Sequence, residues 1–182
     1  DLAFSTDGTK MFIVGTNSKS VFEYNLSTGF DVSTASYVDG YSVNSQETLP
    51  TGLEFSADGK RMFITGNNGD DVTEYKLTTA FDVSTASHVG QFDVSSQETQ
   101  ASSIAFNAEG TKMFVLGYNG EDVNEYNLTS AFRVANDTGS VGSALIGAYG
   151  TLTMSSDGSY TYAANSSIVG LDSNESVYDY FT

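Results

Sequence analysis

The chain has 182 residues, which is enough for one medium-sized domain or two small ones. It holds 7 Lys and Arg against 23 Asp and Glu, and the formal net charge of −16 would repel a nucleic-acid backbone or an anionic membrane surface. Nucleic-acid binding is therefore not expected. Because cysteine is absent and no apolar run is long, thiol chemistry and membrane insertion are not expected either. We interpret the acidity first as a source of solubility.

One stretch of sequence occurs three times. It begins at Phe4, Phe55 and Phe106, so each copy starts 51 residues after the previous one without any gap. The middle copy reads FSADGKRMFITGNNGDDVTEY. A fixed period of about 50 residues is typical of solenoids, propellers and other repeat arrays.

Each repeat is predicted to begin with three short strands. In the middle copy the first is Leu53–Phe55, followed by a turn at Asp58-Gly59, where glycine takes a positive φ at little cost. The second, Met62–Thr65, is almost continuously apolar, as expected for a strand covered on both faces. A second turn over Gly66–Asp71 leads to the third strand, Val72–Leu77.

The remainder of each repeat is predicted to be a loop and a fourth strand. The segment FDVSTAS occurs letter for letter at Phe30–Ser36 and Phe81–Ser87, where we expect a loop with a short turn. Val89–Val94 alternates apolar and polar residues, which predicts a strand. Because no segment has a sustained 3.6-residue apolar period, essentially no helix is expected and the predicted fold class is all-β.

Four strands in about 50 residues match one blade of a β-propeller. The stretches F-S-x-D-G-x-K-M-F, V-x-E-Y-x-L and F-D-V-S-T-A-S resemble the propeller-type repeats of large secreted or surface-attached bacterial proteins in the WD-repeat and YVTN-like superfamily. The resemblance covers residues 1–135, as blades over 1–51, 52–102 and, in part, 103–135. Since propellers close with about four to eight blades, we expect an incomplete propeller or an open arc, whose exposed blade faces could self-associate.

The period is lost at about residue 136, which predicts a second unit over 136–182. Alternation predicts a β-hairpin formed by Gly150–Met154 and Ser159–Ala163, and a further strand at Ser176–Phe181. The motif YGTLTMSSDGSYTY and the final VYDYFT resemble the VCBS repeat, a cadherin-like module of bacterial adhesins. The resemblance implies part of a β-sandwich module in a long extracellular protein, and the two chain ends lead us to expect a fragment.

The two resemblances together imply a function. They favour a non-enzymatic binding or adhesion module, located outside the cell or on its surface, with glycans or surface proteins as partners. One alternative is a structural spacer, and another is a fragment of a propeller enzyme whose active site lies outside this chain. His88 is the only histidine and no phosphate-binding loop is present, so we predict no catalytic residue and no enzyme.

The acidic turns that precede the third strands are candidate calcium ligands. Asp70 and Asp71 close the turn of the second repeat, and Glu121 and Asp122 close that of the third. Carboxylate oxygens are the ligands that Ca²⁺ prefers, although the spacing does not match an EF-hand loop. The alternative is that these are plain hairpin turns and that the chain has no cofactor.

Three further sets of residues recur with the repeat. The charged sets are Glu23, Glu74 and Glu125, with Lys10, Arg61 and Lys112 on the adjacent predicted strand. We interpret them as one cross-strand ion pair in each blade, with a ligand-binding ring as the alternative. The aromatic sets are Phe12, Phe63 and Phe114, which we assign to the core, and Tyr24, Tyr75 and Tyr126, which are candidates for stacking on sugars or partners.

Overall fold

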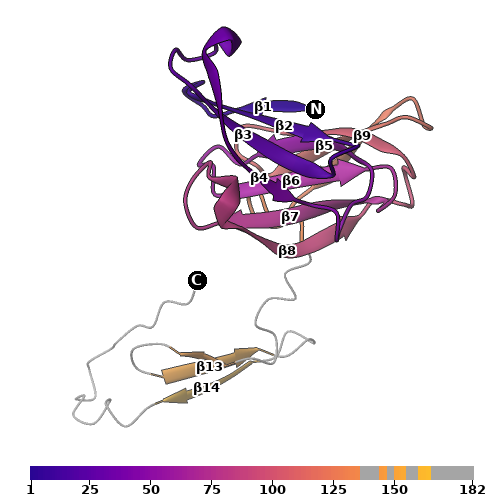
Figure 1. Cartoon of the computed structure of the whole chain (residues 1–182). Coiled ribbons are helices and arrows are strands. Elements are labelled where there is room, and N and C mark those ends of the chain that lie inside the picture. The colour runs from indigo at the N-terminus through magenta and orange to yellow at the C-terminus, as the bar shows by residue number, and fades with distance from the viewer. Residues whose placement is uncertain (136–143, 147–149, 155–159, 165–182) are drawn as a thin grey trace. The chain divides into compact units, whose positions relative to one another are not determined.

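A computed structural model describes residues 1–135, 144–146, 150–154 and 160–164 (Figure 1). The chain divides into two units, Asp1–Asp137 and Thr138–Thr182, and each is described by itself. In the described residues all regular structure is β-strand apart from two single-turn 3₁₀ helices, so the all-β prediction is confirmed. No helix of this part is long and apolar enough to cross a membrane.

The first unit consists of three successive antiparallel sheets. The first contains β1 (Leu2–Phe4), β2 (Lys10–Gly15), β3 (Ser20–Leu26) and β4 (Ala35–Ser42) in sequence order. The second contains β5 (Pro50–Phe55), β6 (Arg61–Gly66), β7 (Asp71–Leu77) and β8 (Ala86–Asp93) in the same order. The third contains β9 (Ala101–Phe106), β10 (Lys112–Gly117) and β11 (Val123–Asn127). Each sheet therefore corresponds to one sequence repeat, as predicted for propeller-type blades.

The strands extend somewhat beyond the predicted ranges. β5 begins at Pro50 instead of Leu53, because its first residues already pair with the end of β6. The repeated FDVSTAS segment forms the predicted short turn, a 3₁₀ helix at Val32–Thr34 and again at Val83–Thr85. In each case the preceding aspartate caps the turn by accepting a hydrogen bond from a serine amide.

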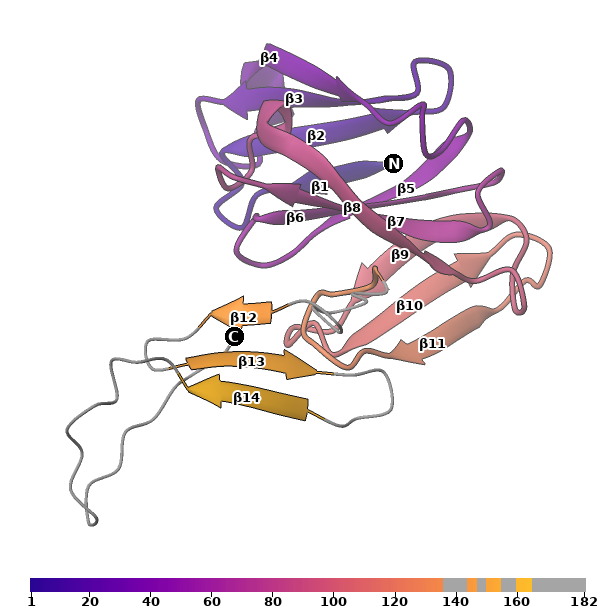
Figure 2. The same cartoon turned by 90° about the horizontal axis from the view of Figure 1, so that it is seen from below.

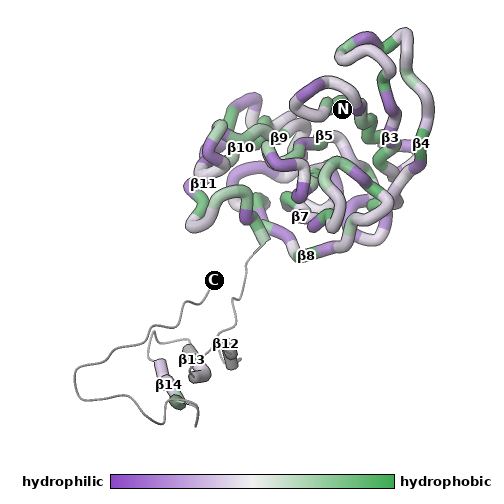
Figure 3. Tube along the Cα trace, turned by 90° about the vertical axis from the view of Figure 1, so that its left-hand side faces the viewer, coloured by the Kyte–Doolittle hydropathy of each residue, from purple (hydrophilic) through white to green (hydrophobic). Residues whose placement is uncertain are grey.

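The blades lie side by side, with the second blade between the first and the third (Figure 2). The first strands β1, β5 and β9 contact one another in succession. One hydrophobic cluster joins Phe12, Val14 and Val21 of the first blade to the second blade, and another joins Phe63 and Val72 of the second blade to the third. Hydrophobic and hydrophilic residues alternate in short stretches through all three blades (Figure 3), as expected for strands that bury their faces between neighbouring sheets.

An Asp-Gly or Glu-Gly turn joins the first two strands of every blade, and a phenylalanine covers it. Gly8, Gly59 and Gly110 have φ values of 69°, 67° and 68°. A Cβ atom at Gly59 would overlap the ring of Phe81, and the other two glycines are covered in the same way by Phe30 and Phe132. Glycine is thus required both for its left-handed backbone and for the close approach of the ring.

The second unit contains one described sheet. β12 (Ala144–Ile146), β13 (Gly150–Met154) and β14 (Tyr160–Ala164) form an antiparallel sheet in sequence order. The pairing of β13 with β14 confirms the predicted hairpin. The turn between them and the strand predicted at Ser176–Phe181 lie outside the described residues, and the resemblance of this unit to a VCBS module stays a prediction.

Candidate functional site

The recurring charged residues form ion pairs within each blade, which confirms that interpretation. Lys10 pairs with Glu23, Arg61 with Glu74 and Lys112 with Glu125. In the first two blades the glutamate is buried, which the pattern of adjacent strands alone did not predict. Burial follows because the next blade covers them, and a buried carboxylate needs hydrogen bonds as well as a cation.

The next blade supplies these hydrogen bonds from the segment that begins at Phe81 in the second blade and at Phe132 in the third. The amide of Val83 donates to Glu23 Oε2 at 3.0 Å, and Lys10 Nζ donates to the carbonyl oxygen of Phe81 at 2.9 Å. Glu74 is held in the same way, because its Oε2 accepts hydrogen bonds from the amides of Val134 and Ala135 at 2.9 and 3.0 Å. The ion pairs of the first two blades therefore join one blade to the next.

A second periodic glutamate fixes the crossover between blades. Glu47 and Glu98 lie in the SQET segments that lead from one blade to the next, and both are buried. Glu98 accepts hydrogen bonds from the amides of Gly120 and Gln100, which hold the pKa of its carboxyl below the ordinary value. The sequence analysis missed this role, although the repeated S-Q-E-T motif was a visible signal for it.

The four proposed calcium ligands lie in two different environments. Asp71 is buried at the start of β7 and accepts a hydrogen bond from the Thr73 hydroxyl at 3.0 Å. Desolvation raises the pKa of Asp71 to about 6, and nearby acidic side chains, first Glu47 and then Asp93, add to the shift.

The remaining candidate ligands lie in the turns. Asp70 and Glu121 adopt left-handed backbone conformations, with φ of 49° and 50°, and Lys19 takes the same conformation at the equivalent position of the first repeat. Asp122 is exposed and accepts a hydrogen bond from the Asn124 amide group at 3.0 Å. Within the described residues no three His, Cys, Asp or Glu side chains gather as a metal site, so calcium binding stays a prediction.

The aromatic predictions have mixed outcomes. Phe12 and Phe63 are completely buried, as predicted, and Phe114 is half-buried. Tyr75 is also completely buried, so its assignment to sugar or partner stacking is wrong. Its ring packs against the exposed His88 with 5.8 Å between the ring centroids. The mixed composition of its strand concealed that the neighbouring blade covers it.

A pocket at the Asp-Gly-turn end of the first unit is the candidate functional site. Three blades contribute to it, because Phe4, Phe55 and Phe106 occupy the same position in each repeat and all three line it. The cavity volume is about 210 Å³, and Phe81 and Phe132 also line it. It therefore lies where the ends of β1, β5 and β9 converge, and it combines aromatic walls with polar groups.

Glu54 is the only acidic side chain among the residues that line this pocket. Burial raises the pKa of its carboxyl above the ordinary value, which one hydrogen bond from the amide of Phe55, at 3.2 Å, partly offsets. The equivalent residues of the other repeats are Ala3 and Ala105. Since the blade does not need an acid there, a half-buried carboxyl group of perturbed pKa in a pocket is a candidate general base or acid.

Sequence analysis missed Glu54 because it followed residues that the repeats share. The signal was the exception, a glutamate where the other copies have alanine. The other polar groups of the pocket are the hydroxyls of Thr6 and Ser56 and the amide of Asn107. Together they could orient a small polar ligand against the phenylalanine rings.

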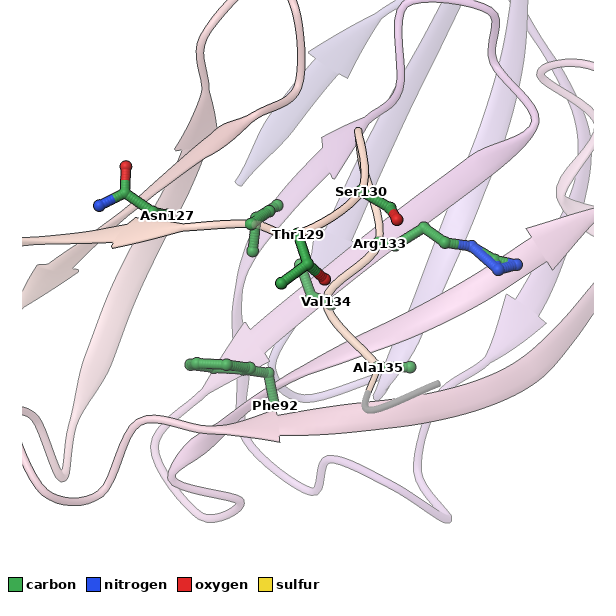
Figure 4. Close-up of a pocket in the computed structure, with 8 residues that line it drawn as sticks. Phe92, Asn127, Thr129, Ser130, Arg133, Val134 and Ala135 are labelled. Atoms are coloured by element: carbon green, nitrogen blue, oxygen red, sulfur yellow. The ribbon is translucent and has the colours of Figure 1, made fainter. Parts of the chain in front are cut away.

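A second cavity, of about 180 Å³, lies between the second and third blades (Figure 4). Its walls include Phe92 of β8, Asn127 at the end of β11, and Arg133 and Val134 of the segment that follows β11. None of the residues that line it is an aspartate, a glutamate or a histidine. The residues that line this cavity can form hydrogen bonds with a ligand, and none of them has a group suited to proton transfer at neutral pH.

No known family pattern matches the chain, and no curated protein matches it. Solved structures do match in fold. A protein from Bacteroides fragilis described as a 6-phosphogluconolactonase has 14% identity and a TM-score of 0.54, and the match covers 70% of this chain and 34% of that protein. The periplasmic gluconolactonase of Pseudomonas aeruginosa has 17% identity and a TM-score of 0.54, over 90% of this chain and 42% of that protein.

A β-propeller domain is also among the similar structures. The propeller domain of Swd1 from Myceliophteria thermophila has 12% identity and a TM-score of 0.53, and the match covers 71% of this chain and 40% of that domain. The chain thus has the fold of propeller blades, and it spans about a third to two fifths of the length of these structures.

These likenesses correct one prediction. We expected that the chain is not an enzyme, and structures of the same fold that carry the enzyme names 6-phosphogluconolactonase and gluconolactonase contradict that expectation. The reasoning failed because it looked for a histidine-based triad or a phosphate loop, and a pocket between blades needs neither. The findings favour the propeller-enzyme alternative over a non-enzymatic adhesion module.

Proposed function

We propose that this chain is part of a propeller enzyme that hydrolyses a small lactone of a sugar acid, with the Glu54 pocket as part of the reaction site. The observation that carries the proposal is the single carboxyl group of raised pKa in a pocket to which three blades contribute. The names of the similar structures suggest the substrate class, at identities of 14% and 17%.

The chemistry asks little of the protein. Water attacks the lactone carbonyl carbon while the Glu54 carboxylate accepts a proton from that water. The ring C–O bond then breaks, and the leaving oxygen receives the proton, so that lactone plus water gives the open hydroxy acid. A carboxyl group whose pKa is raised towards the working pH is a better base for this step than an ordinary glutamate. The phenylalanine rings would pack against the sugar-acid ring.

The test is hydrolysis of glucono-δ-lactone by the whole chain, followed by titration of the acid released. Glu54→Ala restores the residue that the first and third repeats contain, so it should fold normally and lose activity by about 100-fold or more. Glu121→Gln changes an exposed acid of the third blade that does not line the pocket, and it is the matched control. No turnover above the spontaneous rate, or equal turnover by Glu54→Ala, would overturn the proposal.

The pH profile gives a second readout. A general base must be deprotonated, so activity should rise with pH through the raised pKa of Glu54. This limb should disappear from the residual activity of Glu54→Ala and stay in Glu121→Gln. The extracellular location and the partners stay predictions. Calcium binding at Asp70, Asp71, Glu121 and Asp122 can be tested by comparing the melting temperature of the chain with calcium and with a chelator.

A further inference from the structure

Equivalent residues on the first-strand side of the blades differ sharply in exposure. Leu2 is 49% exposed, whereas Leu53 and Ile104 at the same repeat position are 2% and 4% exposed. The valines that end the equivalent Phe-Asp-Val and Phe-Arg-Val segments show the same contrast, with Val32 at 57% against Val83 at 0% and Val134 at 2%. We call the exposed surface formed by Leu2, Phe30 and Val32 the leading face. In the second and third blades its counterparts are covered by the preceding blade.

The third blade shows the opposite contrast. Val123 is 61% exposed, whereas Val21 and Val72 at the same repeat position are 0% exposed. Leu116, its partner on β10, is exposed as well. The ion pair beside them, Lys112 with Glu125, has side chains that are 42% and 45% exposed. We call the surface formed by Lys112, Leu116, Val123 and Glu125 the trailing face.

The two faces complement each other, because their counterparts already meet within the chain, and at both junctions the valine amide of the next blade donates to the buried glutamate. Between the first two blades, Glu23 accepts a hydrogen bond from the Val83 amide, and Lys10 donates one to the Phe81 carbonyl. The trailing face presents a glutamate and a lysine in the same repeat positions. The leading face presents the corresponding amide at Val32 and the carbonyl at Phe30.

We propose that the leading face of one copy of this chain binds the trailing face of a second copy, head to tail. The amide of Val32 donates to Glu125 of the neighbouring copy, and Lys112 donates to the Phe30 carbonyl. Leu2 and Val32 pack on Val123 and Leu116, which removes apolar surface from water on both copies. The second copy is the occupant because its surface has the matching apolar residues, charges and backbone groups.

The contact joins two different surfaces, so it is heterologous and either closes into a ring or extends as a filament. In Figure 2 the first and third blades lie on either side of the second, so the leading and trailing faces belong to blades on opposite sides of it. Two copies with three blades each supply six blades, within the range of about four to eight that propellers use. We therefore expect a closed pair.

The experiment is sedimentation equilibrium of the whole chain over a range of concentrations. Wild type should have the mass of two copies. Val32→Glu and Glu125→Lys should each weaken association by about tenfold or more, because a charge is placed in an apolar contact or the acceptor is lost. Val38→Glu is the matched control, since Val38 and its counterpart Val89 are both exposed and lie outside either face. Circular dichroism and melting verify that each variant is folded.

A mixing experiment separates head-to-tail association from other kinds. Val32→Glu retains an intact trailing face and Glu125→Lys retains an intact leading face. Each should be a monomer alone, and an equimolar mixture should form a one-to-one pair through the remaining interface. A monomer at all concentrations for wild type, or association that both substitutions leave unchanged, would overturn the proposal. Open chains of copies that these substitutions abolish would support the contact and overturn ring closure.

Discussion

The second and third blades have almost the same sequence motifs and quite different environments. In the second blade Arg61 forms an ion pair with Glu74, which the third blade covers. Glu74 also accepts hydrogen bonds from two backbone amides of that blade. In the third blade the equivalent pair, Lys112 with Glu125, is partly exposed, as are the neighbouring Leu116 and Val123. From this comparison we expect the residues of a blade motif to contribute strongly to the free energy of unfolding only where the next blade packs on them.

The ion pairs give the largest expected difference between these blades. Glu74→Ala removes the carboxylate that pairs with Arg61 and that accepts hydrogen bonds from two buried amides, and we expect it to lower the free energy of unfolding by about 3 kcal/mol. Glu125→Ala should lower it by less than about 1 kcal/mol, because an exposed pair is solvated and screened. Urea denaturation of both variants measures the difference. Equal losses would show that burial of the glutamate does not determine how much the ion pair contributes to the free energy of unfolding.

The valines of the third strands give the second contrast. Val72→Ala removes methyl groups from the cluster between the second and third blades, and a loss of about 2 kcal/mol is expected. Val123→Ala changes an exposed side chain and should cost less than about 0.5 kcal/mol. Both values come from the midpoints and slopes of urea unfolding curves. The comparison would fail if the exposed valine proved as important as the buried one.

Association of copies could blur both contrasts. If the trailing face binds a second copy, Glu125 and Val123 become covered as the protein concentration rises. The unfolding experiments should therefore be made at concentrations at which wild type is a monomer, and repeated in the Val32→Glu background. The differences predicted above apply to the monomer.

The repeat made the blade architecture predictable. The Asp-Gly turns, the apolar second strand and the constant period of 51 residues each have a local cause in backbone conformation or patterning. The pairing of Glu23, Glu74 and Glu125 with their cations also followed from adjacent strands. What one copy of the motif does locally is thus readable from sequence.

Burial of the third strands could not be predicted in the same way, because it depends on which blade lies beside which. The sequence VTEYKL has mixed polarity, yet Tyr75, Glu74 and Val72 are all buried. Glu54 escaped notice for a different reason. It is absent from the other repeats, and its importance comes from the convergence of three blades at one pocket.

The turn glycines sharpen the comparison between the first and second blades. Gly8→Ala and Gly59→Ala each place a Cβ on a left-handed residue, which costs about 1 kcal/mol. The added Cβ also meets the ring of Phe30 or of Phe81. Phe30 is exposed and can move away, whereas Phe81 packs on the core cluster between the blades. We therefore expect the melting temperature to fall more for Gly59→Ala, by roughly 2–4 °C for each additional kcal/mol.

Equal melting temperatures would show whether the backbone or the phenylalanine ring requires glycine at these turns. If both variants melt at the same temperature, the positive φ accounts for the whole cost and the phenylalanine rings adapt equally in both blades. Gly110→Ala offers a third measurement, because Phe132 is half-buried as Phe81 is. It should behave like Gly59→Ala.

The smallest expected effect concerns the turn acids Asp71 and Asp122, one buried in the second blade and one exposed in the third. Burial raises the pKa of Asp71 to about 6, so between about pH 4 and pH 6 the folded state binds a proton that the unfolded state releases. Asp71 therefore destabilises the fold at pH 7, and this effect disappears as the pH falls through 6 towards 4. Wild type should gain about 1 kcal/mol relative to Asp71→Asn between pH 7 and pH 4.5. Urea unfolding at several pH values measures this, with Asp122→Asn as the matched control. A difference that stays flat, or that favours wild type as the pH rises, would mean that Asp71 is ionised without penalty and that a cation or solvent reaches it.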